Sequence, residues 1–276
     1  MNPVSLETRI EELLAYLQGS GSALLAYSGG TDSTLLLYLL KRSGIPSITA
    51  VTSVSDITHQ DDIQFARDIV SLWKVKHIEY KSSFFDNPEA VRNTRERCYF
   101  CKHVFFSKLI GIASENNIEK VIDGTHSGDT LDYRPGSRAV SELGICSPFK
   151  DTGWDKDIIC EVSRHLEIPG SGRMSESCLA TRVPYGVRIG PKNLMMIKDA
   201  EEFLKGLGFK GLRVRSDGVT ARIEIDQRNI KDIAEDEMRK KIAGNLRAMG
   251  FKFISLDMEG FESGKMNRLL NDTGKD

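Results

Sequence analysis

Hydrophobic residues in the first half of the chain alternate between short apolar runs and stripes with helical spacing. The runs at 23–27, 47–54, 77–80 and 120–125 predict buried strands. The stripes predict helices over residues 5–18, 35–40, 59–73 and 102–116. Strands that alternate with helices in this way imply an α/β fold with a doubly wound parallel sheet. Ligands of such sheets bind at the carboxyl ends of the strands, so we expect residues 28–33, 52–56 and 123–129 to share that edge.

The pattern changes after the last of these strands. Residues 135–191 are rich in Gly, Pro and Ser, with one helix predicted at 155–166, and long irregular stretches of this kind often form active-site loops. The remainder predicts a small α+β domain with helices at 193–207 and 230–249 and strands at 212–216, 219–225 and 251–256. Asp217-Gly218 between two of these strands is a type I′ hairpin signal. We therefore expect two domains, 1–186 and 187–276.

The composition is that of an ordinary globular protein, with 40% hydrophobic and 28% charged residues among 276. The formal net charge is −1 and the isoelectric point about 6.5, so no global basic field would attract nucleic acid. No apolar run approaches the roughly 20 residues that span a bilayer, and the first residues lack the apolar core of a signal peptide. We expect a cytoplasmic protein without membrane contact, whose five cysteines are thiols, metal ligands or reactive groups rather than disulfides.

Six small or polar residues follow the first predicted strand and precede a predicted helix. They are Ser28-Gly29-Gly30-Thr31-Asp32-Ser33. A strand, tight turn and helix aim backbone N–H groups at an anion, and the two glycines permit positive φ and close approach. Asp32 beside a phosphate requires a neutralising cation, which suggests Mg²⁺-bound pyrophosphate. The motif lacks the lysine of a Walker A loop and resembles the PP-loop of the ATP pyrophosphatases, which split ATP between the α- and β-phosphates.

Three of the cysteines are candidates for holding a metal or cluster, or for acting as reactive thiols. Cys98 and Cys101 form a C-x-x-C just before a predicted helix, and this motif alone fits half a zinc site, a redox pair or part of an iron–sulfur site. Cys178 lies in a polar loop near two arginines, where a reactive thiolate is favoured. If these three thiolates converge, they suit a [4Fe–4S] cluster with one open iron. Cys146 and Cys160 are expected to be structural.

Three segments of the sequence, taken together, indicate the protein family more specifically than the PP-loop does alone. The PP-loop is followed by Asp123-Gly124-Thr125 running into Asp132-Tyr133-Arg134-Pro135-Gly136, and later by Ser175-Glu176-Ser177-Cys178-Leu179-Ala180-Thr181-Arg182. In this order they resemble the LarE family, ATP-dependent sulfur transferases that build the nickel-pincer nucleotide cofactor of lactate racemase. The resemblance covers nearly the whole chain. It implies adenylation of the carboxylates of pyridinium-3,5-biscarboxylic acid mononucleotide and their conversion to thiocarboxylates.

The resemblance also implies roles for individual residues. The cysteine at the Cys178 position is catalytic. In one branch of the family it gives up its own sulfur, and in another three cysteines hold a [4Fe–4S] cluster that carries an extra sulfide. Because Cys98 and Cys101 accompany Cys178, the chain resembles the cluster branch. ATP would be bound through Ser28, Gly29, Gly30, Asp32, Ser33, Asp123, Gly124 and Thr125.

In this family the C-terminal domain supplies residues that hold the substrate phosphate and a metal. The matching positions are Arg213 and Arg215 for the phosphate and Glu201 and Asp232 for the metal, with Arg182 as a further binding residue. Arg213 and Arg215 are two apart, so they share one face of a strand and could clamp a phosphate. We also expect a homo-oligomer and a separate donor of sulfide.

Three other functions share some of these features. A tRNA 2-thiolation enzyme also combines a PP-loop with C-x-x-C and cluster chemistry, but the near-zero net charge argues against nucleic acid as a partner. An amide-forming synthetase that uses ammonia would leave the cysteines without a role. A non-enzymatic ATP- or zinc-sensing module would not need the intact PP-loop.

Overall fold

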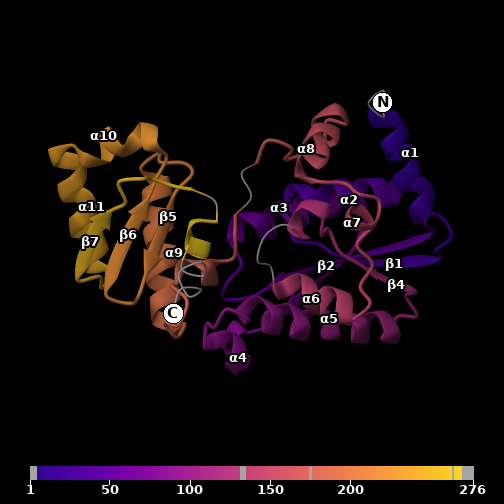
Figure 1. Cartoon of the computed structure of the whole chain (residues 1–276), viewed down its shortest axis with the longest axis horizontal. Coiled ribbons are helices and arrows are strands. Elements are labelled where there is room, and N and C mark those ends of the chain that lie inside the picture. Colours follow the sequence, from indigo (N-terminus) through magenta and orange to yellow (C-terminus); the bar gives the residue numbers. More distant parts are fainter. Residues whose placement is uncertain (1–4, 131–134, 174–175, 263, 269–276) are drawn as a thin grey trace, which may run out of the picture. The chain divides into compact units, whose positions relative to one another are not determined.

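The computed structural model describes residues 5–130, 135–173, 176–262 and 264–268. They form two compact units (Figure 1), one from Met1–Asn87 with Cys98–Glu176 and the other from Pro88–Arg97 with Ser177–Asp276. The units thus divide after Glu176 rather than after residue 186, and a short segment from the first half of the chain joins the second unit.

A four-stranded parallel sheet forms the centre of the first unit. Its strands are β1 (Ser22–Ala26), β2 (Ser47–Val54), β3 (Lys76–Lys81) and β4 (Lys120–Ile122), in the order β3-β2-β1-β4. All three pairings are parallel, which confirms the predicted doubly wound α/β fold. The direction of winding reverses between β1 and β4, and at such a switch point the loops after the two strands leave room for a ligand.

Helices cover both faces of this sheet, and the alternating side chains of β1 show which helix covers which face. Leu24 points into a core with α5 (Arg97–Glu115) and α6 (Pro135–Glu142), below the sheet in Figure 1. Ala23 and Leu25 point to the other face. Their core also contains α1 (Leu6–Leu17), α2 (Thr31–Arg42), α3 (Gln60–Leu72) and α8 (Lys156–His165). Because both faces are buried, the centre of β1 is apolar throughout.

The segment expected to be mostly irregular contains more helix than predicted. Besides α8, residues 135–191 form α6, α7 (Pro148–Asp151) and the 3₁₀ turn η3 (Leu179–Arg182). Such short helices have too few turns to show a helical period in the sequence. α5 begins at Arg97, so the C-x-x-C is part of its first turn rather than of the preceding loop. The other short helical elements are η1 (Phe84–Asp86), α4 (Pro88–Val91), η2 (Ser127–Thr130), η4 (Gln227–Asn229) and η5 (Lys265–Asn267).

The second unit is a three-stranded sheet with helices packed on one face. Strands β5 (Arg213–Ser216), β6 (Thr220–Glu224) and β7 (Phe253–Leu256) lie in the order β5-β6-β7, the first pair antiparallel and the second parallel. The helices are α9 (Pro191–Gly206), α10 (Ile230–Ala234) and α11 (Asp236–Ala248). Val214 and Ile223 belong to the core shared with these helices, so their strand neighbours face the opposite way. This is the α+β unit that the sequence predicts.

The long helix predicted over residues 230–249 is wrong in one respect. It is interrupted at Glu235, whose ψ of 145° is extended, and α11 begins at Asp236. Acidic side chains are favourable at a helix N-terminus. Asp236 and Glu237 are therefore well placed in the first turn of a new helix.

The hairpin between β5 and β6 forms, but its turn is not type I′. That turn needs positive φ at both central residues, whereas Gly218 has a φ of 97° and Asp217 is not in the left-handed region. The carboxylate of Asp217 instead accepts hydrogen bonds from the backbone N–H groups of Val219 and Thr220, at 2.8 and 2.7 Å. A side chain that bonds its own loop offers an alternative to the primed turn.

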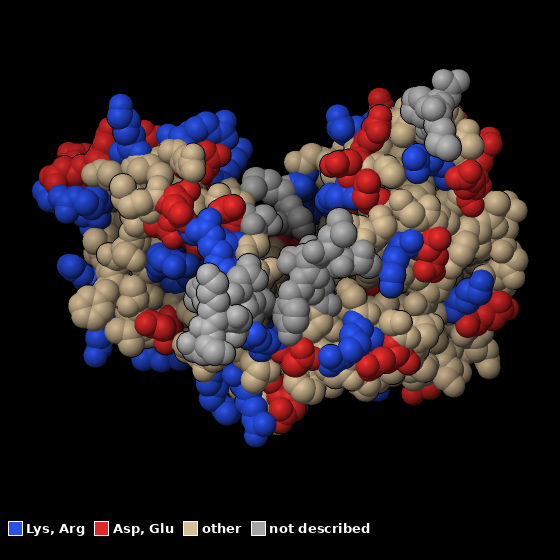
Figure 2. Space-filling model, in the orientation of Figure 1, with Lys and Arg blue, Asp and Glu red and all other residues tan. Residues whose placement is uncertain are grey.

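Charges on the surface are mixed. Basic and acidic side chains are interspersed over the face shown in Figure 2, in keeping with a net charge of −1. None of the described helices is both long and apolar enough to cross a membrane.

The turn between β1 and α2 packs directly on α3. Gly29 has a φ of +76°, and a Cβ there would lie 2.5 Å from the carbonyl oxygen of Asp62 and 3.2 Å from Cβ of Ala66. Gly30 has a φ of −77°, so the positive φ that the sequence analysis allowed at both glycines is used only at Gly29. Gly29 is thus required twice, by its conformation and by the space available.

We predict that Gly29→Ala destabilises the protein more than Gly44→Ala. Gly44 also has a positive φ, of +81°, but a Cβ there meets nothing within 4 Å. Gly44→Ala should therefore cost only the left-handed strain of about 1 to 2 kcal/mol. Gly29→Ala should cost at least about 1 kcal/mol more, because the backbone of α3 must move. Chemical denaturation of both variants measures the difference, and equal losses of stability would contradict the proposed close contact.

Candidate active site

Hydrogen bonds inside residues 28–33 hold the loop in one conformation. The hydroxyl oxygens of Ser28 and Ser33 are 3.0 Å apart, and the backbone N–H of Gly30 donates to Ser28 Oγ at 3.2 Å. Ser33 Oγ also bonds the carbonyl oxygen of Gly30, at 3.1 Å. Gly30 is the N-cap of α2, and no side chain of the described residues caps this helix end. Its first N–H groups therefore suit an anion, as the sequence predicts.

Asp32, in the first turn of α2, forms an ion pair with Lys156 of α8. Sequence analysis did not single out Lys156, because 124 residues separate it from Asp32. The lysine side chain is 42% exposed, so the pair is open to solvent and can exchange the amine for another cation. The role of Asp32 in holding Mg²⁺ stays a prediction.

A small hollow of about 80 Å³ opens beside the loop, lined by residues 28–31, Asp62, Arg173 and Glu176. Arg173 donates a hydrogen bond from Nη2 to Asp62 Oδ1 at 3.0 Å, and its guanidinium lies over the ring of Phe65, 4.1 Å from the ring centre. Its other terminal nitrogen, Nη1, is buried and has no hydrogen-bond partner among the described residues. Burial raises the pKa of Asp62, and the positive charge of Arg173 opposes that rise.

The residues after β4 lie against the start of α2. A Cβ on Gly124 would contact the backbone nitrogen of Ser33 at 3.5 Å, so these two loops converge as expected. The buried carboxylate of Asp123 accepts hydrogen bonds from Ser147 Oγ at 2.6 Å and from the backbone N–H of Thr125 at 3.2 Å. The Thr125 hydroxyl also donates to Asp123. In this structure Asp123 holds the loop together, and contact of residues 123–125 with ATP stays a prediction.

Residues 52–56, the third segment expected at the carboxyl edge of the sheet, form hydrogen bonds with neighbouring parts of the first unit. Thr52 lies within β2, where its hydroxyl oxygen is 2.9 Å from Nε2 of His77. Asp56 accepts hydrogen bonds from the hydroxyl of Ser83 at 2.7 Å and from the backbone N–H of Phe84 at 2.9 Å. Both side chains thus stabilise the sheet edge and the turn that follows β3.

Cys98 and Cys101 lie in the first turn of α5, three residues apart and therefore on the same side of the helix. Both are half-buried and neither is in a disulfide. Gly136, at the start of α6, lies against this turn, since a Cβ there would be 2.8 Å from Cδ of Lys102 and 3.4 Å from the carbonyl oxygen of Cys98. The nearest of these atoms belongs to the flexible side chain of Lys102, so the available space does not by itself require glycine at this position. The first three residues of that segment, Asp132, Tyr133 and Arg134, lie outside the described residues.

In the second unit, Cys178 is exposed and immediately precedes η3. Arg182, at the end of η3, is fully buried and donates to both carboxylate oxygens of Glu201, at 2.6 and 3.2 Å. Arg182 also donates to the carbonyl oxygen and the hydroxyl of Ser177, at 3.1 and 2.7 Å. Oε1 of Glu201 accepts the backbone N–H of Val214 as well, at 2.9 Å. This ion pair anchors the Cys178 segment to α9 and β5, and the predicted binding roles of Arg182 and Glu201 stay predictions.

Arg213 and Arg215 lie on the sheet face opposite the core of the second unit, as their spacing predicts. The guanidinium of Arg213 lies 4.8 Å from the ring centre of Phe261. Arg215 donates to Glu224 Oε2 at 3.0 Å, and Arg222, its partner across the hairpin, donates to Glu224 Oε1 at 3.0 Å. The face is therefore rich in arginine, with one buried carboxylate between two of the guanidinium groups.

A pocket on this face has a volume of about 400 Å³, within the usual range of about 300 to 1,000 Å³ for small-molecule sites. Its lining includes Arg215, Arg222 and Lys265. The buried amine of Lys265 is neutralised by Asp257 at 2.6 Å. Asp232, the other predicted metal ligand, is exposed on α10 and does not line this pocket.

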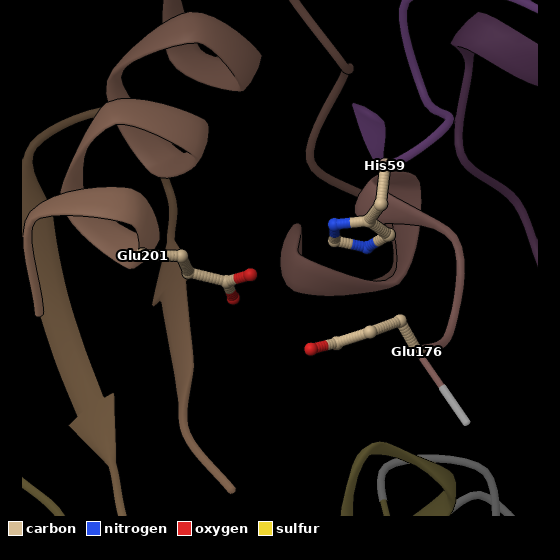
Figure 3. A group of neighbouring side chains, drawn as sticks. All are labelled: His59, Glu176 and Glu201. Carbon is tan, nitrogen blue, oxygen red and sulfur yellow. The ribbon is translucent and has the colours of Figure 1, made fainter. Parts of the chain in front are cut away.

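A histidine and a carboxylate lie together in the first unit. Figure 3 shows His59, which precedes α3, and Glu176, whose carboxylate oxygen lies within 4.8 Å of a ring nitrogen of His59. Glu201, drawn in the same figure, belongs to the second unit and is paired with Arg182. Two ligands from one unit do not by themselves define a metal centre.

The remaining cysteines differ in their surroundings. Cys146 extends the sheet beside β4, since its N–H donates to the carbonyl of Val121 at 3.0 Å and its carbonyl accepts from Asp123 at 2.9 Å. Its Sγ lies 3.5 Å from the hydroxyl of Tyr16, and burial raises the pKa of this thiol. Cys146 is thus structural, as expected. Cys160 is half-buried on α8 rather than fully within the core.

Sequence reasoning missed the contacts of several charged residues in these sites. Only Arg173 had a local signal, because it ends the turn Gly170-Ser171-Gly172-Arg173, whose glycines are typical of a backbone packed closely on a neighbour. The others lie in ordinary helices, strands or turns. They are Lys156, Arg222 and Lys265.

We predict that Glu201→Ala strongly destabilises the second unit. It would leave Arg182 buried without its counter-charge, which costs about 3 to 5 kcal/mol. Glu202→Ala is the matched control, since Glu202 is the next residue of α9 and its side chain is 59% exposed. The control should change stability by no more than about 0.5 kcal/mol. Equal unfolding midpoints for the two variants in denaturant would show that the ion pair does not anchor the segment.

Comparison with known proteins agrees with the sequence motifs. No protein-family model matches the chain. An uncharacterised protein of Synechocystis is 32% identical over 80% of this chain and 82% of its own length. An uncharacterised protein of Methanocaldococcus jannaschii is 32% identical over 80% of this chain and 88% of its own. The pyridinium-3,5-bisthiocarboxylic acid mononucleotide synthase of Lactiplantibacillus plantarum is 30% identical over 82% of each chain. At this identity and coverage, the chain belongs to the LarE family, that of pyridinium-3,5-bisthiocarboxylic acid mononucleotide synthase.

Proposed function

We propose that this protein is an ATP-dependent sulfur transferase that converts the carboxylates of pyridinium-3,5-biscarboxylic acid mononucleotide to thiocarboxylates. The observation that carries the proposal is the loop of residues 28–33, which presents the uncapped N-terminus of α2 at the switch point between β1 and β4. The name of the Lactiplantibacillus relative supports the same product. The mixed surface charge in Figure 2 gives no support to a tRNA substrate.

In the first step a carboxylate oxygen of the substrate attacks the α-phosphorus of Mg·ATP. A P–O bond forms, and the bond from the α-phosphorus to the bridging oxygen breaks with its electron pair on pyrophosphate. The N–H groups at the start of α2 and the hydroxyls of Ser28 and Ser33 would stabilise the phosphates. The reaction needs ATP because oxide is a very poor leaving group from a carboxylate, whereas AMP is a good one from the acyl-adenylate.

In the second step sulfur replaces AMP. If Cys178 is the donor, its thiolate attacks the acyl carbon and AMP leaves, which gives a thioester. Removal of the Cα proton then breaks the Cβ–S bond, so the thiocarboxylate departs and dehydroalanine remains. The exposure of Cys178 allows access of a substrate to the thiol.

A [4Fe–4S] cluster is the other source of sulfur in this proposal. Cys98 and Cys101 fit as two of its ligands, since they are half-buried on one side of the first turn of α5. Cys178 would be the third. When bound, the cluster would supply a sulfide for transfer, and the chain's thiolates would hold it.

The substrate phosphate would bind to the arginine face of the second unit. Arg213 and Arg215 are held there by Phe261 and Glu224, which orient the guanidinium groups before any ligand arrives. Arg215 also donates from Nη1 to the carbonyl oxygen of Thr181 at 2.7 Å, so a phosphate bound by Arg215 would replace one of its present partners.

We predict that Cys178→Ala abolishes thiocarboxylate formation but retains release of pyrophosphate. The variant keeps the loop of residues 28–33, which performs the adenylation, and lacks the thiol that both sulfur routes require. Pyrophosphate release and the mass of the pyridinium product measure the two steps separately. Cys160→Ala is the control and should retain both. Full thiocarboxylate formation by Cys178→Ala would refute both routes.

Metal content decides between the two sulfur sources. Protein purified without oxygen should hold about four irons and at least four acid-labile sulfides per chain if the cluster forms, and Cys98→Ala should lose them. Protein without iron that still forms product should instead lose about 34 Da in mass after turnover, the H₂S removed from cysteine. Protein with neither iron nor a change in mass, yet active over many turnovers, would contradict both forms of the proposal.

A further inference from the structure

Arg173, which lines the hollow beside residues 28–31, carries a hydrogen-bond donor that no described residue uses. Nη1 of Arg173 is buried and has no partner among the described residues, while Nη2 of the same guanidinium donates to Asp62. Buried donors without a partner are unfavourable, so their persistence calls for an explanation. We infer that Arg173 contacts the β- and γ-phosphates of ATP and stabilises the pyrophosphate leaving group. The inference rests on the proposed function, since it assigns a residue to the same ATP site.

Three contacts fix the position of the guanidinium. Nη2 donates to Asp62 Oδ1 at 3.0 Å and lies 3.5 Å from the carbonyl oxygen of Asp61. The ring of Phe65 lies beneath the guanidinium, 4.1 Å from its central carbon. Asp61, Asp62 and Phe65 all belong to α3, the helix on which Gly29 packs. The arginine and the phosphate-binding loop are therefore aligned by the same helix.

The turn that carries Arg173 also contacts the loop directly. Thr31 Oγ1 donates to the carbonyl oxygen of Gly170 at 3.4 Å, and the N–H of Arg173 donates to the same carbonyl at 2.9 Å. Gly170 has a φ of +79°, and a Cβ there would lie 2.7 Å from the Phe65 ring. The turn is thus packed tightly against both neighbours, which limits the freedom of the arginine.

Charge in the hollow explains why a cation is needed there. Its described lining includes two carboxylates, Asp62 and Glu176, and Arg173 is the cation among the described residues that line it. When the bond to the α-phosphorus breaks, the bridging oxygen takes the electron pair and the pyrophosphate gains negative charge. A guanidinium held in place for this charge needs no reorganisation during the reaction. Its planar fork of donors matches phosphate oxygens better than an ammonium does.

The alternative is that Arg173 only fastens its turn to α3. The two roles differ in which ligands they affect. A residue that contacts the β- and γ-phosphates matters for ATP and pyrophosphate but not for AMP, which lacks these groups. If Arg173 only anchors its turn to α3, its substitution would lower thermal stability. It would then change the binding of ATP, pyrophosphate and AMP alike, or of none of them.

The test compares Arg173→Ala, Arg173→Lys and the control Arg67→Ala in the full chain. Arg67 is a cation on the same helix α3, but it is 44% exposed and paired with Glu79. Equilibrium binding of pyrophosphate and of AMP is measured with Mg²⁺, together with the rate of pyrophosphate release and the melting temperature. We expect Arg173→Ala to slow release by about 10²-fold or more and to weaken pyrophosphate binding at least about tenfold, with AMP binding within about twofold of the unsubstituted protein.

Arg173→Lys retains the charge without the planar fork, and it should regain part of the affinity for pyrophosphate. It also keeps the inference testable if Arg173→Ala does not fold, because the ratio of pyrophosphate to AMP affinity should still fall. Arg67→Ala should match the unsubstituted protein. Unchanged pyrophosphate binding in both Arg173 variants, or equal loss for pyrophosphate and AMP, would overturn the inference while leaving the proposed function intact. An unsubstituted chain that neither binds pyrophosphate nor releases it from ATP would overturn both.

Discussion

Burial of β1 on both faces is the constraint on which the first unit depends. Leu24 faces the core with α5 and α6, whereas Ala23 and Leu25 face the core with α1, α2, α3 and α8. A strand enclosed in this way cannot present polar groups along its length, so chemistry is confined to its carboxyl end. The neighbouring strand β4 comes from much later in the chain, and its loop meets the start of α2 there. The close packing of Gly29 on α3 follows from the same layered arrangement.

The second unit depends on charges that are buried in pairs. The ion pairs of Arg182 with Glu201 and of Arg215 with Glu224 are both removed from water. Desolvation of such pairs offsets much of their attraction, so they contribute little net stability compared with apolar residues. They do fix the relative positions of the segments that they join, because the angles and distances of a bidentate pair allow little variation. The segment that carries Cys178 is therefore held in place by this charge pair together with the buried side chains of Leu179 and Ala180.

Two arginines illustrate how a structural role differs from a binding role. The guanidinium of Arg182 has protein partners at Nε, Nη1 and Nη2, in Glu201 and Ser177. Arg173 is also oriented by a carboxylate, but it lines a hollow beside a phosphate-binding loop, and its Nη1 has no partner among the described residues. Both residues are arginines in polar segments of the sequence, and the glycine-rich turn before Arg173 does not by itself show which of them keeps a donor without a described partner. The difference lies in which side chains surround them after folding.

The amino-acid sequence by itself determined the elements with strong periodicity, the doubly wound sheet and the phosphate-binding turn, because these depend on residues close together in the chain. Apolar runs predicted β1 to β4, and glycine beside serine and aspartate predicted the loop of residues 28–33. Local sequence signals did not predict the short helices α6 and α7 or the break at Glu235, because contacts between residues far apart in the chain determine these features. The tertiary structure alone decided that Glu201 pairs with Arg182, that Lys156 reaches Asp32 and that Arg173 retains a donor, because each depends on residues brought together only by packing.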